Sequence, residues 1–429
     1  MTTHLDRSIA PERHPVTNIS LVPPRRHDLP NGIPVFIIDN PTLDLIHLNI
    51  ELSVGSLHET VKHALRFAYF LLKESSPRHT AAEMDGLLDF HGATYSVSVT
   101  LDRIQLKITI PKKTVPHILP AIFEFISSPT YREENLEIYK ERKIKDLEYS
   151  SQKMDVRCSQ LALHALFGDA LAAGRFSTPE TMRAVTIMQM ETCHRTTFCA
   201  ENMRIYATGN FDSTLERCID ELFGQTPHGT PAPRIHDLAL FKESKPLIQE
   251  ERPDSVQSSI MLCRPAVGFA DPSRRDLTIL STLTGGYFGS RLMQRLREKE
   301  GYTYGAYADL TFFGNQSLFS ISSDVNAQDT PAAVDACFEE MALLCQEPVG
   351  EEELSLVRRH IEGSLLRDVE NSVSYMRKIA HWHARGLDEK EFQTMLRHVN
   401  DITAEQIQRL SKKFFEHNKF TQIIVGNTL

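Results

Sequence analysis

The chain lacks any long apolar run. No window of its 429 residues approaches the roughly 18 uncharged apolar residues that a membrane-spanning helix needs, so we expect no transmembrane segment. The first thirty residues contain Arg7, Arg13, Arg25 and Arg26, which argues against a standard signal peptide. The net charge of −9 argues against nucleic acid and anionic membranes as partners, because both attract basic surfaces.

Paired cysteine motifs are also missing. The seven cysteines are odd in number and never form CxxC, so neither a disulfide framework nor a zinc ribbon is expected. They are typical of reduced, buried thiols, which places the protein in the cytoplasm. The chain contains no HExxH zinc motif and no GxSxG nucleophile motif, which leaves no support for a hydrolase using a serine nucleophile.

The length and an internal repeat predict two domains. A single core rarely grows beyond roughly 250–300 residues. The segments 198–210 and 415–427 both run from an aromatic residue through an asparagine to an apolar strand that ends in Gly-Asn. Their final glycines, Gly209 and Gly426, are 217 residues apart, which indicates a duplication. We expect domains at 28–223 and 241–429, joined by a linker at 224–240 that begins with a Gly- and Pro-rich stretch.

The coarse order of elements predicts an α+β fold. Strands are expected at 35–38, 45–54, 93–100 and 104–110, and helices at 60–73, 81–91, 115–127 and 133–151. In the second strand, Ile46, Leu48, Ile50 and Leu52 alternate with other residues, as in a strand with one buried face. Strands, helices, strands and helices in this order favour antiparallel sheets flanked by helices over a regular βαβ series.

Two segments of the first half resemble the start of a domain of the M16 (insulinase or pitrilysin) metallopeptidases. They are the turn Leu29–Gly32 (LPNG) and Val54–Glu59 (VGSLHE), followed by a helical stretch. In that family the helix carries HxxEH, whose two histidines bind zinc and whose glutamate activates water. Here Arg66, Tyr69 and Phe70 occupy these positions, and they cannot replace two imidazoles and a carboxylate. The resemblance, which covers about residues 28–429, therefore implies a degenerate zinc motif and no metal bound by this chain.

Glu148 matches the third zinc ligand of the family, and Glu141 lies seven residues before it. Two glutamates at this spacing on a charged helix are more often solvated side chains. We interpret Glu148 as vestigial.

A second resemblance lies in the other half. The segments 285–292 (GGYFGSRL) and 294–307 (QRLREKEGYTYGAY) are similar to the family's C-terminal domain, in which a Gly-rich turn precedes R-x6-Y. Arg297 and Tyr304 match that pair, which in the family acts on the substrate carbonyl at the zinc site of the other half. The alternatives are a salt bridge at a helix end for Arg297 and a packed strand aromatic for Tyr304.

The glycine-rich turn is expected to contribute to substrate binding through Gly285, Gly286, Gly289 and Ser290. The alternative is a plain turn before a helix. A pair of histidines, His381 and His383, is spaced i, i+2. Side chains at this spacing point apart on a helix, so we interpret both as structural.

The resemblance implies two homologous domains arranged as half of a clamshell. It also implies the non-zinc subunit of a heterodimeric peptidase, acting in trans with an HxxEH-containing M16 subunit that holds the Zn²⁺ and cleaves peptides. A different hypothesis is a catalytically inactive scaffold or peptide-binding protein, in which Arg297 and Tyr304 have no catalytic role. Neither hypothesis includes nucleic acid or a membrane as a partner.

Overall fold

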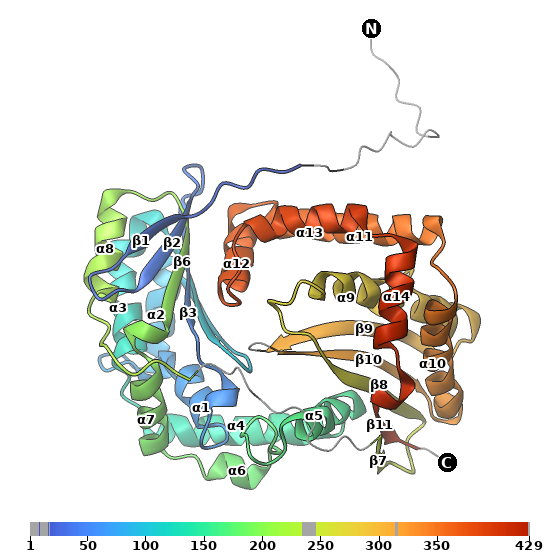
Figure 1. Cartoon of the computed structure of the whole chain (residues 1–429). Helices are drawn as coiled ribbons and strands as arrows, with labels where there is room; N and C mark the ends of the chain where they lie inside the picture. The colour runs from blue at the N-terminus through green and yellow to red at the C-terminus, as the bar shows by residue number, and fades with distance from the viewer. Residues whose placement is uncertain (1–7, 9–15, 17, 234–245, 314–315, 428–429) are drawn as a thin grey trace.

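Two β-sheets lie on opposite sides of the molecule, each with helices on its outer face (Figure 1). This computed structural model describes residues 8, 16, 18–233, 246–313 and 316–427. Residues 234–240 of the expected linker lie outside the described residues. The first sheet begins at Arg25, a few residues before the expected boundary at 28. The domain boundaries themselves stay a prediction.

The first sheet has six strands in the order β1-β2-β6-β3-β5-β4, and the second has five in the order β7-β11-β8-β10-β9. Their bounds are β1 Arg25–Asp28, β2 Pro34–Asp39, β3 Leu45–Leu52, β4 Thr94–Val99, β5 Ile104–Pro111, β6 Met203–Gly209, β7 Leu247–Glu251, β8 Gln257–Ala266, β9 Thr303–Phe313, β10 Gln316–Asn326 and β11 Thr421–Gly426. All neighbours are antiparallel except β2·β6 and β7·β11. The α+β fold is confirmed, but the expectation of wholly antiparallel sheets is wrong for this one pair in each sheet. In both cases the last strand of the half follows helices and pairs with an early strand of that half, β6 with β2 and β11 with β7.

Helices fill the remainder of both halves. In the first half they are α1 Ala64–Phe70, α2 Ala81–His91, α3 Val115–Ser127, α4 Glu133–Ser151, α5 Met154–Phe167, α6 Pro179–Arg183, α7 Ile187–Thr197 and α8 Ser213–Phe223. In the second they are α9 Arg274–Ser281, α10 Thr330–Gln346, α11 Glu351–Val369, α12 Ser372–His383, α13 Lys390–Asp401 and α14 Ala404–Phe414, with π-helical turns at Thr282–Gly286 and Met293–Lys299. None of the described helices is long and apolar enough to cross a lipid bilayer.

The two halves share one sheet topology, which confirms the internal repeat. Setting β1 aside, the strands of each half lie in the same spatial order: first, fifth, second, fourth, third. Gly209 and Gly426 end the equivalent strands β6 and β11 with φ of +144° and +147°. Their carbonyl oxygens accept equivalent hydrogen bonds, from the N–H of Asn40 at 2.8 Å and of Arg252 at 2.9 Å. The duplication therefore extends to single backbone positions.

The alternation in β3 sets the two faces of the first sheet. Ile46, Leu48, Ile50 and Leu52 are buried in the apolar core of the first half. The opposite face carries His47, Asn49 and Glu51, as the period of two in a strand requires. The first sheet therefore has an apolar outer face under its own helices and a polar inner face.

Helix α1 is shorter than the expected 60–73. It begins at Ala64 because His63 has a left-handed φ of 73°. The buried carboxylate of Glu59 accepts hydrogen bonds from the backbone N–H groups of His63 and Arg66 at 3.3 and 3.2 Å. The carboxylate thus satisfies N–H groups at the helix N-terminus that an earlier helical turn would otherwise satisfy. By contrast α2, α3 and α4 have the expected bounds.

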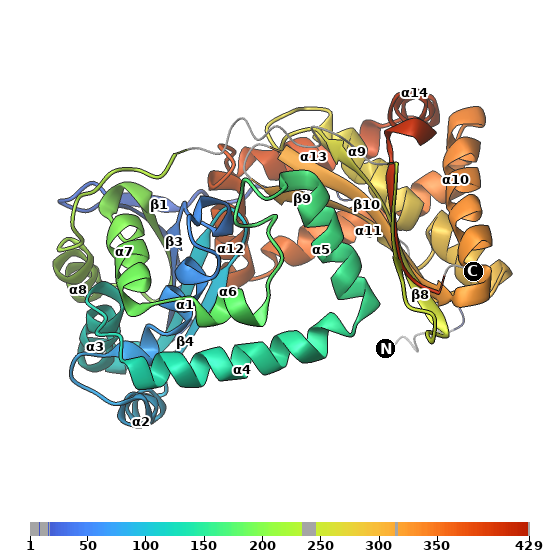
Figure 2. The same cartoon turned by 90° about the horizontal axis from the view of Figure 1, so that it is seen from below.

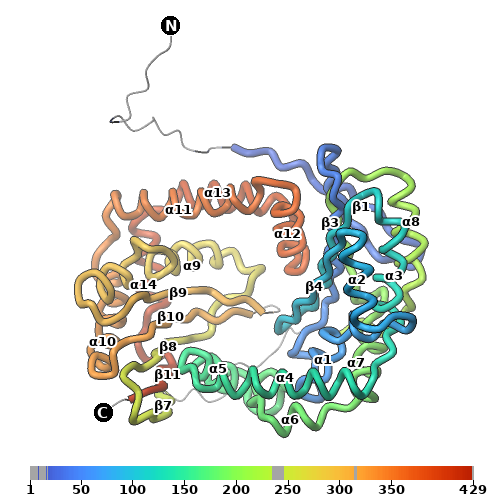
Figure 3. Tube along the Cα trace, turned by 180° about the vertical axis from the view of Figure 1, so that it is seen from behind, coloured from blue at the N-terminus to red at the C-terminus, as the bar shows by residue number. Residues whose placement is uncertain are grey.

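Each half also covers the inner face of the other half's sheet with one helix. Helix α5 packs on β8 and β11, and α12 packs on β6, β2 and β3. In the first contact the thiol of Cys158 donates to the carbonyl oxygen of Ser259 at 3.3 Å. In the second the ring of His383 lies 4.4 Å from the ring of Phe36. Figures 2 and 3 show α5 beside the second sheet and α12 beside the first.

Substituting alanine at the two repeat glycines is expected to destabilise the fold. A Cβ on Gly209 would lie 2.4 Å from the carbonyl oxygen of Leu45, and one on Gly426 would lie 2.6 Å from the Cα of Ser258. Together with the positive φ values, this predicts that Gly209→Ala and Gly426→Ala each lower the free energy of unfolding by about 2 kcal/mol or more. Urea unfolding followed by circular dichroism measures the change.

Gly363→Ala is the matched control. Gly363 lies inside α11, and its nearest foreign atom to a new Cβ is Nη1 of Arg367 at 3.8 Å. Alanine there is expected to stabilise by about 0.5–1 kcal/mol. Equal effects at Gly209, Gly426 and Gly363 would contradict the strain argument.

Candidate functional site

The three residues expected at the zinc-motif positions lie in different environments. Arg66 is exposed on α1 and Phe70 is half-buried. Tyr69 is fully buried, and its hydroxyl lies 2.8 Å from Oγ1 of Thr197 in α7. Burial raises the pKa of Tyr69 well above its ordinary value. These side chains present a cation, a neutral phenol and a phenyl ring, none of which is a zinc ligand at neutral pH.

Two glutamates of α4 were singled out by the sequence analysis. Glu141 and Glu148 are exposed, which agrees with solvated side chains. Within the described residues, no group of three or more His, Cys, Asp or Glu is placed to hold a metal ion. The residues that this chain offers at the position of the family's zinc site therefore do not fit zinc.

The glycine-rich turn is packed tightly against β9. A Cβ on Gly285 would lie 2.3 Å from the backbone nitrogen of Ala308, so only glycine allows this approach. Gly285 and Gly286 line a cavity of about 810 Å³. Gly289 lies under the ring of Tyr287, where a Cβ would come within 2.8 Å, and Ser290 is buried. Gly286 thus faces open space, whereas Gly285 and Ser290 are part of the packed turn.

Arg297 and Tyr304 occupy different environments. Tyr304 is 90% exposed on β9 and lines a cavity of about 500 Å³. The side chain of Arg297 is 34% exposed, and its Nη1 lies 3.5 Å from Oε1 of Glu298. Its guanidinium carbon lies 4.5 Å from the ring centre of Phe288. Arg297 therefore makes a loose ion pair, as in the alternative of a salt bridge at a helix end. Tyr304, by contrast, is not a packed strand aromatic.

The two cavities adjoin over the inner face of the second sheet. Both are lined by Ser159 on α5, Met261 on β8, Tyr307 on β9 and Ser322 on β10. Strand β9 is the last strand of that sheet and pairs only with β10 among the described strands. The site thus combines an unpaired strand edge with open space beside it.

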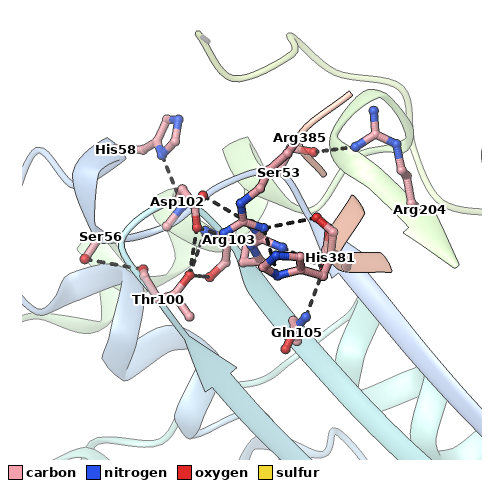
Figure 4. Close-up of polar contacts among 12 residues, drawn as sticks. Ser53, Ser56, His58, Thr100, Asp102, Arg103, Gln105, Arg204, His381 and Arg385 are labelled. Carbon is pink, nitrogen blue, oxygen red and sulfur yellow. Dashed lines mark hydrogen bonds and ion pairs between the residues drawn. The ribbon is translucent and has the colours of Figure 1, made fainter. Parts of the chain in front are cut away.

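A buried polar cluster lies where α12 meets the first sheet (Figure 4). Nη1 of Arg103 is 3.6 Å from Oε2 of Glu51, and its Nε is 3.2 Å from Oδ1 of Asp102. Burial raises the pKa of Glu51, and the nearby Arg103 opposes that shift. From the other half, Arg385 donates to the carbonyl oxygen of His381 at 3.1 Å.

Burial lowers the pKa of Arg385 to about 10, and the positive charge of Arg103 adds to that effect. Burial and the charge of Arg385 lower the pKa of His381 to about 2, so this imidazole is neutral. His383 lies instead between Phe36 and Tyr206. The two histidines have different neighbours, as their spacing predicts: His381 lies against Phe269 of its own half, and His383 belongs to the contact between the halves.

Two side chains at the site were not identified from the sequence. Phe288 is 63% exposed and Tyr307 is 60% exposed, beside Arg297 and Tyr304 respectively. Both residues lie inside motifs that the sequence analysis quoted, Phe288 in GGYFGS and Tyr307 in TYGAY. Whether such an aromatic residue belongs to the site depends on its exposure, which a sequence pattern does not show.

Comparisons with known proteins agree with this description. Residues 184–361 match the family described as the Peptidase M16 inactive domain. The chain is 21% identical over 410 residues to an uncharacterized zinc protease of Mycobacterium tuberculosis, covering 94% of this chain and 93% of that one. It is 20% identical over 404 residues to the non-peptidase homolog YmxG of Helicobacter pylori, covering 92% of each chain.

Solved structures show the same fold. The peptidase M16 inactive domain from Pseudomonas fluorescens superposes with a TM-score of 0.86 at 20% identity, covering 95% of this chain and 98% of that one. A protease from Helicobacter pylori superposes with a TM-score of 0.84 at 15% identity, covering 94% and 100%. The resemblance to the M16 family is confirmed.

The buried position of Tyr69 predicts that the glutamate of the motif cannot simply be restored. Tyr69→Glu would bury an unpaired carboxylate and is expected to lower the free energy of unfolding by about 3 kcal/mol or more. Tyr69→Phe, which removes only the hydrogen bond to Thr197, is expected to cost about 1 kcal/mol. Denaturant unfolding at pH 7 measures both.

Arg66→His serves as the control on the same helix, since Arg66 is exposed. It is expected to change the unfolding free energy by no more than about 0.5 kcal/mol. A Tyr69→Glu variant as stable as Arg66→His would show that position 69 is open to solvent, against the structure.

Proposed function

We propose that this chain is the non-zinc subunit of a heterodimeric M16-type peptidase. It contributes Arg297 and Tyr304 in trans to a partner that carries HxxEH. The zinc chemistry is supplied by the partner, and this chain binds and orients the peptide. The seven cysteines are all free, which supports a reducing compartment such as the cytoplasm.

The exposure of Tyr304 is the observation that carries the proposal. A tyrosine that serves packing buries its ring, yet 90% of Tyr304 is exposed. Its hydroxyl has no hydrogen-bond partner within the described residues. The residue lies on β9 and lines the cavity of about 500 Å³. A phenol in this position is free to donate a hydrogen bond to a carbonyl oxygen of a bound peptide.

Arg297 is held ready for a polar ligand. The ring of Phe288 supports its guanidinium through a cation–π contact. Its Nη1 makes no hydrogen bond within the described part of the chain, although it lies 3.5 Å from Oε1 of Glu298. A guanidinium with unused donors can hold a peptide carbonyl or carboxylate.

The edge of β9 offers the peptide a backbone to pair with. An extended peptide can add to an open strand edge through main-chain hydrogen bonds, while its side chains enter neighbouring pockets. The cavities of about 810 and 500 Å³ beside this edge have the size for several side chains. Gly286, which is exposed at the first cavity, allows close approach of the peptide.

A scaffold or peptide-binding protein without a catalytic role is the alternative. The degenerate zinc motif supports it, and one similar protein is named a non-peptidase homolog. In this case the β9 edge still binds peptide or a partner segment, but the hydroxyl of Tyr304 has no kinetic effect.

A mixing experiment separates the two functions. The chain is combined with an HxxEH-containing M16 protein of similar length, and cleavage of a quenched peptide library is followed. We expect activity only in the mixture, and its loss on addition of a chelator. Tyr304→Phe is expected to lower kcat/KM about 100-fold, in line with the loss of one transition-state hydrogen bond, with assembly on size-exclusion chromatography unchanged.

Tyr149→Phe is the matched control. Tyr149 is also an exposed tyrosine, at 67%, but it lies on α4 away from β9. Its activity in the mixture is expected to equal that of the original chain. A Tyr304→Phe complex that assembles and keeps full activity would favour the scaffold.

A further inference from the structure

A separate cavity of about 180 Å³ lies beside α1, where the family resemblance places the zinc motif. Its walls come from Glu59, Lys62, His63 and Arg66 around the start of α1, and from α5 and residues 173–177. Arg175 belongs to that last segment. The cavity is thus formed by parts of the chain that are distant in sequence.

Three cationic side chains line this cavity, and none of them forms an ion pair with an acid in the described part of the chain. Within the described residues, Lys62, Arg66 and Arg175 form no ion pair within 4 Å. Nζ of Lys62 donates to the carbonyl oxygen of Ala172 at 2.8 Å, and Nε of Arg175 donates to that of Asp169 at 2.8 Å. The guanidinium carbon of Arg66 lies 5.9 Å from the ring centre of Phe70.

The one acid of the cavity is already engaged. Glu59 accepts the two backbone N–H groups at the start of α1, and burial raises its pKa. Burial lowers the pKa of His63 to about 4, so this histidine is neutral at pH 7. Three cations thus face a single carboxylate, and the cavity carries net positive charge.

This arrangement is unfavourable without a counter-charge. Burial lowers the pKa of Lys62, the nearby Glu59 raises it, and the positive charges of Arg66 and Arg175 lower it further. An anion in the cavity would relieve the repulsion among the three side chains and would accept hydrogen bonds from their unused N–H groups. The overall composition does not explain this accumulation of positive charge, because the net charge of the chain is −9.

We propose that this cavity, formed by Lys62, Arg66 and Arg175, is a binding site for an oxyanion: a carboxylate or a phosphate group. The position that the family uses for a divalent cation has the opposite charge preference in this chain. The proposal does not depend on a partner subunit or on Tyr304. Two sources share the chemistry, the carboxylate of a peptide and a free inorganic anion.

Inorganic phosphate tests the site. Isothermal titration of the chain alone, with sodium chloride adjusted to constant ionic strength, is expected to show saturable binding. Arg66→Gln is expected to weaken it about 10-fold, and Lys62→Gln combined with Arg66→Gln to abolish it. Since Arg66 is exposed, its variant is expected to fold normally, which circular dichroism checks.

Arg359→Gln is the control, because Arg359 is an exposed arginine of α11 outside this cavity. Its phosphate affinity is expected to be unchanged. Absence of saturable binding by the original chain, or equal affinities of the Arg66→Gln and Arg359→Gln variants, would overturn the proposal.

Two peptides of one sequence, one with a free C-terminal carboxylate and one with a C-terminal amide, identify the source. Displacement of phosphate by the acid alone assigns the site to a peptide carboxylate. Displacement by neither assigns it to a free anion. Equal displacement by both would mean that the peptide covers the cavity without using its charge, and it would refute a peptide carboxylate as the source.

Discussion

The exchange of helices α5 and α12 between the two halves is the contact on which the rest of the structure depends. Each sheet buries one face under its own helices and receives one helix from the other half on its inner face. A single helix is narrower than a sheet of five or six strands, so part of each inner face stays uncovered. The cavities beside β9 and at the junction of the halves follow from this incomplete cover.

The two exchanged helices differ in chemistry. Around α5 the contact is apolar, with Leu166 and Phe167 among the residues that pack with the second sheet. Around α12 the amide of Asn49, the hydroxyl of Tyr206 and Nδ1 of His383 are buried without hydrogen-bond partners in the described structure. The α12 contact is therefore the more polar of the two.

Helix α1 has two chemically different sides. Tyr69 is a core residue, since its ring is buried and its hydroxyl is hydrogen-bonded to Thr197. Arg66 lines a small cavity together with Lys62 and Arg175. In the second half, the turn at Gly285 is tightly packed and Tyr304 is exposed. The first half thus places a phenol and a cation on α1, which do not bind a metal ion, while the second half presents a phenol to open space.

The sequence by itself determined the local elements and the kinship of the two halves. The bounds of α2 follow from its capping residues: Thr80 and Glu83 form a capping box, and Gly92 ends the helix with φ of 65°. The alternation in β3 predicted its buried face, and the repeat ending at Gly209 and Gly426 predicted equivalent strands. These signals are short-range, so a linear pattern can carry them.

Only the tertiary structure decided which surfaces those elements cover. No pattern indicated that α5 would pack on the sheet of the other half, or that α1 would begin late because the Glu59 carboxylate takes its first N–H groups. The sequence separates Arg175 from Lys62 and Arg66, and it gave no sign that Tyr304 would be exposed while Tyr69 is buried. Burial and charge clustering depend on contacts between distant segments, and those contacts are set by the packing of the whole chain.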